Sequence, residues 1–62
     1  MTEVQIHCAA TEGKAAAHSY PGAASYALCV FISRVHEIRK SAPSIYEEQA
    51  FLDAFLDEEF RL

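Results

Sequence analysis

The 62-residue chain has no tryptophan and only two residues each of glycine, proline and cysteine. Two cysteines permit at most one internal disulfide, so a disulfide-rich scaffold is excluded. We expect Cys8 and Cys29 to be buried free thiols, as is usual for cysteine in a reducing compartment. The two glycines, Gly13 and Gly22, lie too far apart to form a glycine-rich phosphate-binding loop. These scarcities leave a small protein that folds around an ordinary apolar core.

Long apolar runs and positive charge are also scarce. The longest apolar run covers residues 26–32, and a membrane-spanning helix needs about 20 such residues, so no membrane span is expected. The first residues lack the basic and apolar stretches of a signal peptide, which favours a cytoplasmic location. Five Lys and Arg against nine Asp and Glu give a net charge of −4. A surface that neutralises nucleic-acid phosphates is therefore disfavoured.

The residues that are abundant are apolar, at 52% of the chain, and this content predicts folding rather than disorder. One stripe of them repeats at steps of four and three along residues 24–42, which predicts a helix over residues 23–41. Pro21 and Gly22 mark its start. The stripe consists of Ala24, Leu28, Phe31, Val35, Ile38 and Ala42.

A second helix is predicted over residues 44–60. Ser44 and Glu47 have the spacing of a capping box, in which each side chain bonds the backbone N–H of the other residue. The short link between the two amphipathic segments predicts an antiparallel αα-hairpin. The apolar residues assigned to this helix are Ile45, Phe51, Leu52, Phe55, Leu56 and Phe60.

Residues 1–20 are predicted to be an extended N-terminal segment. Val4, Ile6 and Cys8 alternate with polar residues, which is the period of a strand. Residues 11–14 have the composition of a turn, with Gly13 available for a positive φ. Residues 15–20 are compatible with a returning strand or with a short helical or irregular piece. The fold class is therefore mainly α, as one small domain with an extended N-terminal strip.

This arrangement leaves more apolar surface than one hairpin can cover. Tyr26, Cys29 and Val30 point away from the stripe of the first helix. Burying a large apolar side chain contributes about 1.5–3 kcal/mol, so exposing several is costly for a small core. We expect these three residues to form a homodimer interface. The alternative is a monomer in which the N-terminal segment covers them.

Catalytic, cofactor and metal sites are not predicted. The candidate ligands and nucleophiles are His7, Cys8, His18, Cys29 and His36. Adjacent residues on a strand point to opposite faces, and seven residues along a helix span about 10 Å, so these spacings do not bring ligands to one zinc ion. We expect a protein that is not an enzyme and has no cofactor.

Two charged clusters remain as candidate binding surfaces. Asp57, Glu58 and Glu59 lie at a helix C-terminus, where negative charge is unfavourable, and Phe51 and Phe60 flank them. Aromatic anchors surrounded by charge are typical of protein-binding surfaces, although a merely solvated face is the alternative. The second cluster is basic and supports a different hypothesis, a dimeric nucleic-acid-associated regulator. It consists of Arg34, Arg39 and Lys40, which Glu47 and Glu48 could instead balance across the turn.

The two helical segments, SYALCVFISRVHEIRK and YEEQAFLDAFLDEEF, resemble in size and style the small accessory proteins encoded in the early regions of lambdoid phages. The resemblance implies a cytoplasmic protein that modulates a host or phage factor by binding it directly. The sequence therefore predicts a regulatory protein that binds another protein through its acidic-aromatic second helix.

Overall fold

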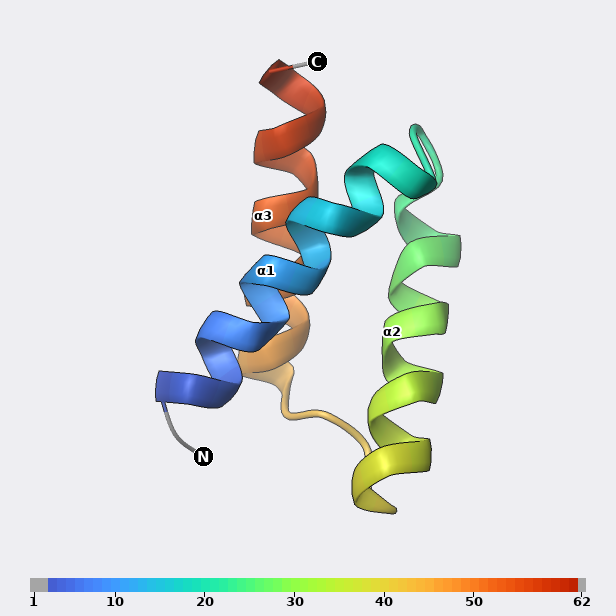
Figure 1. Cartoon of the computed structure of the whole chain (residues 1–62), viewed down its shortest axis with the longest axis vertical. Helices are drawn as coiled ribbons and strands as arrows, with labels where there is room; N and C mark the ends of the chain where they lie inside the picture. The colour runs from blue at the N-terminus through green and yellow to red at the C-terminus, as the bar shows by residue number, and fades with distance from the viewer. Residues whose placement is uncertain (1–2, 62) are drawn as a thin grey trace.

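The computed structural model describes residues 3–61, and this part of the chain consists of three helices with no strand. They are α1 (Glu3–Ser19), α2 (Ala24–Arg39) and α3 (Ile45–Arg61). In Figure 1, α2 and α3 run in opposite directions, and α1 crosses α3 in the same general direction as α3. The mainly helical class is confirmed, and the ends of α2 and α3 lie within two residues of the predicted bounds.

The prediction of an extended N-terminal segment is wrong. Residues 3–19 form α1, while Met1 and Thr2, which belonged to the predicted segment, lie outside the described residues. The alternation of Val4, Ile6 and Cys8 does not mark a buried face, because Val4 and Cys8 are both exposed. Five alanines in residues 9–17 favour a helix instead, since alanine has the highest helix propensity.

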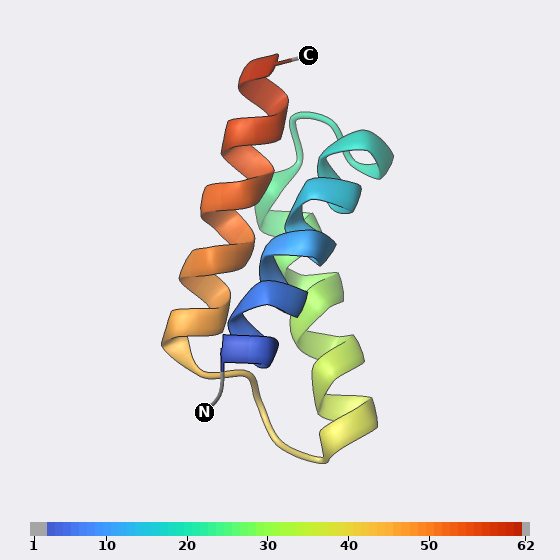
Figure 2. The ribbon, with the colours of Figure 1, turned by 60° about the vertical axis from the view of Figure 1, so that its left-hand side comes forward.

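Gly13 is the point of closest approach between α1 and α3, not the turn residue that the sequence predicted. It is buried in the middle of α1. A Cβ atom placed on Gly13 would overlap the carbonyl oxygen of Phe51 and would lie 2.9 Å from the carbonyl carbon. The two backbones are therefore in direct contact there, and α1 makes most of its contacts with α3. Figure 2 shows this pair side by side from a second direction.

The core is built from one short stripe on each helix, with buried residues spaced four apart. Such stripes form the ridges that pack into the grooves of a crossing helix. The ring centroids of Phe31 and Phe51 are 4.5 Å apart in a stacked pair, and Phe55 lies next to Phe51 at 6.3 Å. The stripes are Ala9, Gly13 and Ala17 on α1, Ala27, Phe31 and Val35 on α2, and Glu47, Phe51 and Phe55 on α3.

Several residues of the predicted stripes lie outside this core. On α2, Phe31 and Val35 are buried as predicted, but Ile38 is 79% exposed and Ala42 follows the end of the helix. On α3, the predicted apolar set divides into two faces. Phe51 and Phe55 are buried, while the exposed members are Ile45, Leu56 and Phe60. The buried residues of α1 are two alanines and a glycine, so the core is narrow, and it leaves Ile45, Leu56 and Phe60 of α3 exposed.

The C-terminus of α2 offers a test of local backbone geometry. Lys40 has φ 61° and donates its backbone N–H to the carbonyl oxygen of His36 at 2.7 Å. A left-handed conformation costs an L-residue about 1–2 kcal/mol, and glycine avoids most of this cost. We therefore expect Lys40→Gly to raise the free energy of unfolding by about 1 kcal/mol in urea titrations. Lys40→Ala is the control for the lost charge, and an equal gain in that variant would contradict the explanation.

Candidate functional site

Glu47 is the one charged side chain buried in the described part of the chain, with 1% of its surface exposed. The predicted capping box is confirmed: the backbone N–H of Ser44 donates to Glu47 Oε2 at 2.7 Å, and the N–H of Glu47 donates to Ser44 Oγ at 3.3 Å. Arg39 at the end of α2 donates to both carboxylate oxygens, at 2.5 and 3.2 Å. This network joins the end of α2 to the start of α3.

The network also sets the charge state of Glu47. Hydrogen bonds from Arg39 lower the pKa of Glu47 to about 2, assisted by Ser44, and burial opposes this shift only in part. The carboxylate is therefore ionised at neutral pH. The site is a structural clasp with no group left to transfer a proton near neutral pH.

Acid titration should reveal this clasp. Because the pKa of Glu47 is lower in the folded chain than in the unfolded one, its stabilisation is present above about pH 4.5 and is lost as the pH falls from there toward 2. The pKa of Glu58 is also lowered, chiefly by its hydrogen bond with His18, so it contributes in the same direction. Urea titrations between pH 6 and 2 should show a shallower loss of stability in Glu47→Gln than in the wild type. Equal pH dependence in both proteins would contradict the assignment, and Asp53→Asn is the exposed control.

Only some of the residues predicted to form the acidic-aromatic binding site are exposed. Phe51 is 1% exposed in the core, so its assignment as a partner-binding residue is wrong. Glu58 Oε2 lies 2.6 Å from His18 Nε2, and Glu59 accepts a hydrogen bond from the backbone N–H of Gly22. Asp57 pairs with Arg61 at 3.1 Å. Glu58 and Glu59 thus hold the end of α1 and the following loop against α3.

Phe60, the remaining member of that set, is 94% exposed. It continues a row of apolar residues along the side of α3 that faces away from α1, and we call this row the outer stripe. Acidic residues border it, with Glu48 on one side and Asp53 and Asp57 on the other. The outer stripe consists of Ile45, Leu52, Leu56 and Phe60, of which only Leu52 packs partly against the core.

The residues predicted for self-association do not form one uncovered patch. Tyr26 is 60% exposed, but its ring packs edge-on against Tyr20 with centroids 5.2 Å apart. Val30 is half-buried and lines a cavity between α1 and α2. Cys29 is exposed, as is Cys8, so the prediction of two buried thiols is wrong although both are free. Tyr26 and Cys29 remain as the exposed part of this set.

The basic cluster is largely neutralised within the chain. Arg34 pairs with Glu12 of α1 at 3.3 Å, and Arg39 pairs with Glu47. Lys40 is exposed at the end of α2. The predicted balance across the turn is confirmed for Arg39, but the acid that balances Arg34 comes from α1, which the sequence did not indicate. Two of the three cations are thus engaged, which weakens the nucleic-acid hypothesis.

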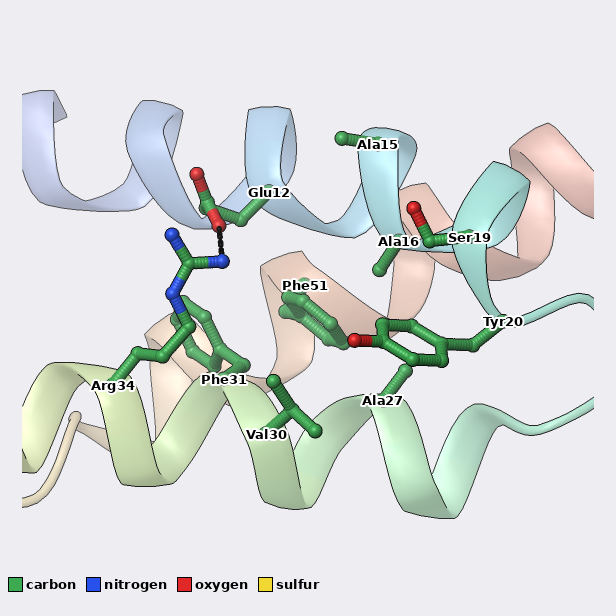
Figure 3. A pocket seen from close by; sticks show the side chains of 10 residues that line it. All are labelled: Glu12, Ala15, Ala16, Ser19, Tyr20, Ala27, Val30, Phe31, Arg34 and Phe51. Atoms are coloured by element: carbon green, nitrogen blue, oxygen red, sulfur yellow. Dashed lines mark ion pairs between the residues drawn. The ribbon is translucent and has the colours of Figure 1, made fainter.

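Two small cavities lie along the seam between α1 and α2, on either side of the Arg34–Glu12 ion pair. Figure 3 shows the first, with Glu12 reaching from α1 to Arg34 on α2 and with Phe51 between this ion pair and Tyr20. Its volume is about 120 Å³, and that of the second, which Ile38 also lines, is about 160 Å³. Pockets for small molecules usually measure about 300–1,000 Å³, so neither cavity accommodates a cofactor-sized ligand.

A third, more open hollow of about 310 Å³ lies between α1 and α3. Charged side chains of both signs border it, including Lys14, Asp57 and Arg61. Asp57 and Arg61 already pair with each other there. Within residues 3–61, no group of three His, Cys, Asp or Glu side chains has an arrangement that could hold a metal ion.

No family model, curated protein or solved structure is detectably similar to this chain. In the part of the chain that the structure describes, no helix is long and apolar enough to cross a membrane.

Proposed function

We propose that the protein is a small, non-enzymatic regulatory protein that binds another protein through the outer stripe of α3. The observation that carries the proposal is the 94% exposure of Phe60 beside Leu56, which is 54% exposed one turn earlier. Aromatic and aliphatic anchors of this kind supply most of the binding free energy at protein interfaces. We extend the proposal to a regulatory role in the cytoplasm, which remains a prediction from the size and style of the two helical segments.

The proposed surface shares some residues with the acidic-aromatic site predicted from the sequence, but it is centred on a different face of α3. Phe60 and Asp57 remain, and Leu56 replaces the buried Phe51 as an apolar anchor. Glu58 and Glu59 act within the chain, so changing them would disturb the fold together with any partner contact. Variants of the outer stripe separate the two effects, because Phe60 and Leu56 make little contact with the core.

The double variant Leu56→Ser, Phe60→Ser tests the proposal. We expect at least a tenfold loss of partner captured from the source cell, measured by quantitative mass spectrometry, because two anchors are removed. The thermal midpoint should change little, since both side chains are exposed. Val4→Ser, a change of an exposed apolar residue on α1, is the control and should retain capture. Undiminished capture by the double variant would refute the proposed surface.

Self-association through α2 is a second candidate, favoured by the exposure of Tyr26 and Cys29 on one helix. A homodimer would cover both residues and add apolar contact to a narrow core. Sedimentation equilibrium of the purified chain should then give twice the mass of one copy, and Tyr26→Ser should shift it toward a single copy. A single-copy mass for the wild type at high concentration would reject the dimer and leave the α3 surface unaffected.

A further inference from the structure

The outer stripe of α3 has the spacing of a surface that packs against another helix. Ile45, Leu52, Leu56 and Phe60 follow one another at steps of seven, four and four, which are whole numbers of helical turns to within a few tenths of a turn, and the polar Gln49 fills the gap between the first two. Apolar residues repeated in this way lie along one line of a helix and form a seam for a second helix. From Ile45 to Phe60 the seam is about 22 Å long at 1.5 Å per residue, which matches four turns of a partner.

Within residues 3–61, three of the four apolar residues of this seam are left uncovered. α1 packs on the side of α3 that carries Phe51 and Phe55, and α2 makes far fewer contacts with α3 than α1 does. Leu52 at the inner edge is partly buried against the core, while Ile45, Leu56 and Phe60 are exposed. α3 therefore presents a second apolar face, separate from its core face.

The charges beside the seam indicate the chemistry of its occupant. Glu48 borders one side, and Asp53 and Asp57 border the other. Arg61 is the one cation of α3, and it already pairs with Asp57. A second copy docked stripe to stripe would bring carboxylates against carboxylates, and juxtaposed like charges disfavour such an interface. An occupant with lysine or arginine beside its apolar residues would instead meet opposite charge on both sides.

We propose that the outer stripe binds an amphipathic helix of a partner protein, with apolar residues at steps of three and four and Lys or Arg along both edges. This inference rests on the proposed function and specifies the class of partner segment. Leu52, Leu56 and Phe60 contact its apolar face, and Asp53 and Glu48 attract its basic edges. Helices that lay an apolar face on such a surface are a recurrent mode of peptide recognition.

The test uses two synthetic helical peptides of four to five turns with identical leucines, one with lysine edges and the other with glutamate edges. Titration of the isotopically labelled full chain should show the lysine peptide binding at least tenfold more tightly, with shifts concentrated on the exposed side of α3. Added salt should reduce the difference in affinity between the two peptides, because the charges on α3 are solvent-exposed and therefore screened. In Leu56→Ser, Phe60→Ser, binding of the lysine peptide should fall at least tenfold.

Charge reversal provides the specific control. Asp53→Lys, Asp57→Lys should invert the preference between the two peptides, whereas Glu37→Lys, a single exposed reversal on α2, should leave it unchanged. Equal binding of both peptides, preference for the glutamate peptide, or shifts concentrated on α1 and α2 would overturn the inference. A dimer of the wild type that Leu56→Ser dissociates would also overturn it, because the stripe would then cover itself.

Capture of the cellular partner by the outer-stripe double variant distinguishes a failure of this inference from a failure of the proposed function. If the peptides show no charge preference but the outer-stripe double variant still loses its cellular partner, the helix inference fails and the binding surface stands. If neither peptide binds and capture is also unaffected, both fail.

Discussion

Replacing Gly13 by alanine should destabilise the protein by about 2–3 kcal/mol, although the same change at an exposed helical position stabilises by about 0.5–1 kcal/mol. The change in stability has the opposite sign at Gly13 because this residue contacts the backbone of α3. An added Cβ would overlap the carbonyl oxygen of Phe51, and a backbone atom has no rotamer change with which to move away. α1 and α3 would have to separate, which would loosen the packing of Ala9 and Ala17 as well.

Urea unfolding followed by circular dichroism measures this effect. Gly13→Val should be more destabilising than Gly13→Ala, because its side chain is larger and β-branched. Thr11→Ala, an exposed change on the same helix, is the control and should stay within about 0.5 kcal/mol of the wild type. A gain in stability for Gly13→Ala would show that the two helices are not in backbone contact.

Glu47→Ala should lower the free energy of unfolding by about 2–3 kcal/mol at neutral pH. The variant loses the cap on α3, which typically contributes about 1 kcal/mol, together with the ion pair to Arg39. The loss is smaller than for a fully enclosed pair, because the Arg39 side chain keeps 32% of its surface exposed and can turn toward water. The N–H of Ser44 would also lose its acceptor.

Neighbouring variants separate these contributions. Glu48→Ala, one residue along and not buried, should change the free energy of unfolding by about 0.5 kcal/mol or less. Glu47→Gln retains an acceptor for Ser44 and should be intermediate between Glu47→Ala and the wild type. If Glu47→Ala behaved like Glu48→Ala in thermal and urea melts, the clasp would have no part in stability.

The parts of the fold that could be predicted from the sequence are those with local signals. Ser44 and Glu47 are three residues apart and mark the start of α3 by their own chemistry, and Pro21 and Gly22 mark the break before α2. α1 could not be predicted in the same way, because three alternating residues imitate a strand. The spacing of Ala9, Gly13 and Ala17 contained the correct signal, a row of small residues that lets another helix approach closely.

The candidate site was harder to predict because its residues depend on tertiary contacts. Phe51 and Phe60 are equally apolar, and the packing of α1 and of Phe31 on α2 decides that one is buried and the other exposed. The acids at the end of α3 likewise find their partners in His18 and Gly22, far away in the chain. The spacing of Ile45, Leu52 and Leu56 indicated an apolar row, but the sequence alone did not distinguish this row from the face of α3 that packs in the core.

The packing of α1 on α3 also bears on the order in which the chain can assemble. The His18–Glu58 contact joins residues 40 positions apart, whereas Arg39 and Glu47 are separated by eight. Closing the longer loop costs about 1.4 kcal/mol more in chain entropy, because the cost rises by about 0.6 kcal/mol for each doubling of length. The Arg39–Glu47 contact between α2 and α3 therefore has the lower entropic cost and can form first. The alanine-rich α1 can then pack against α2 and α3 after this contact has formed.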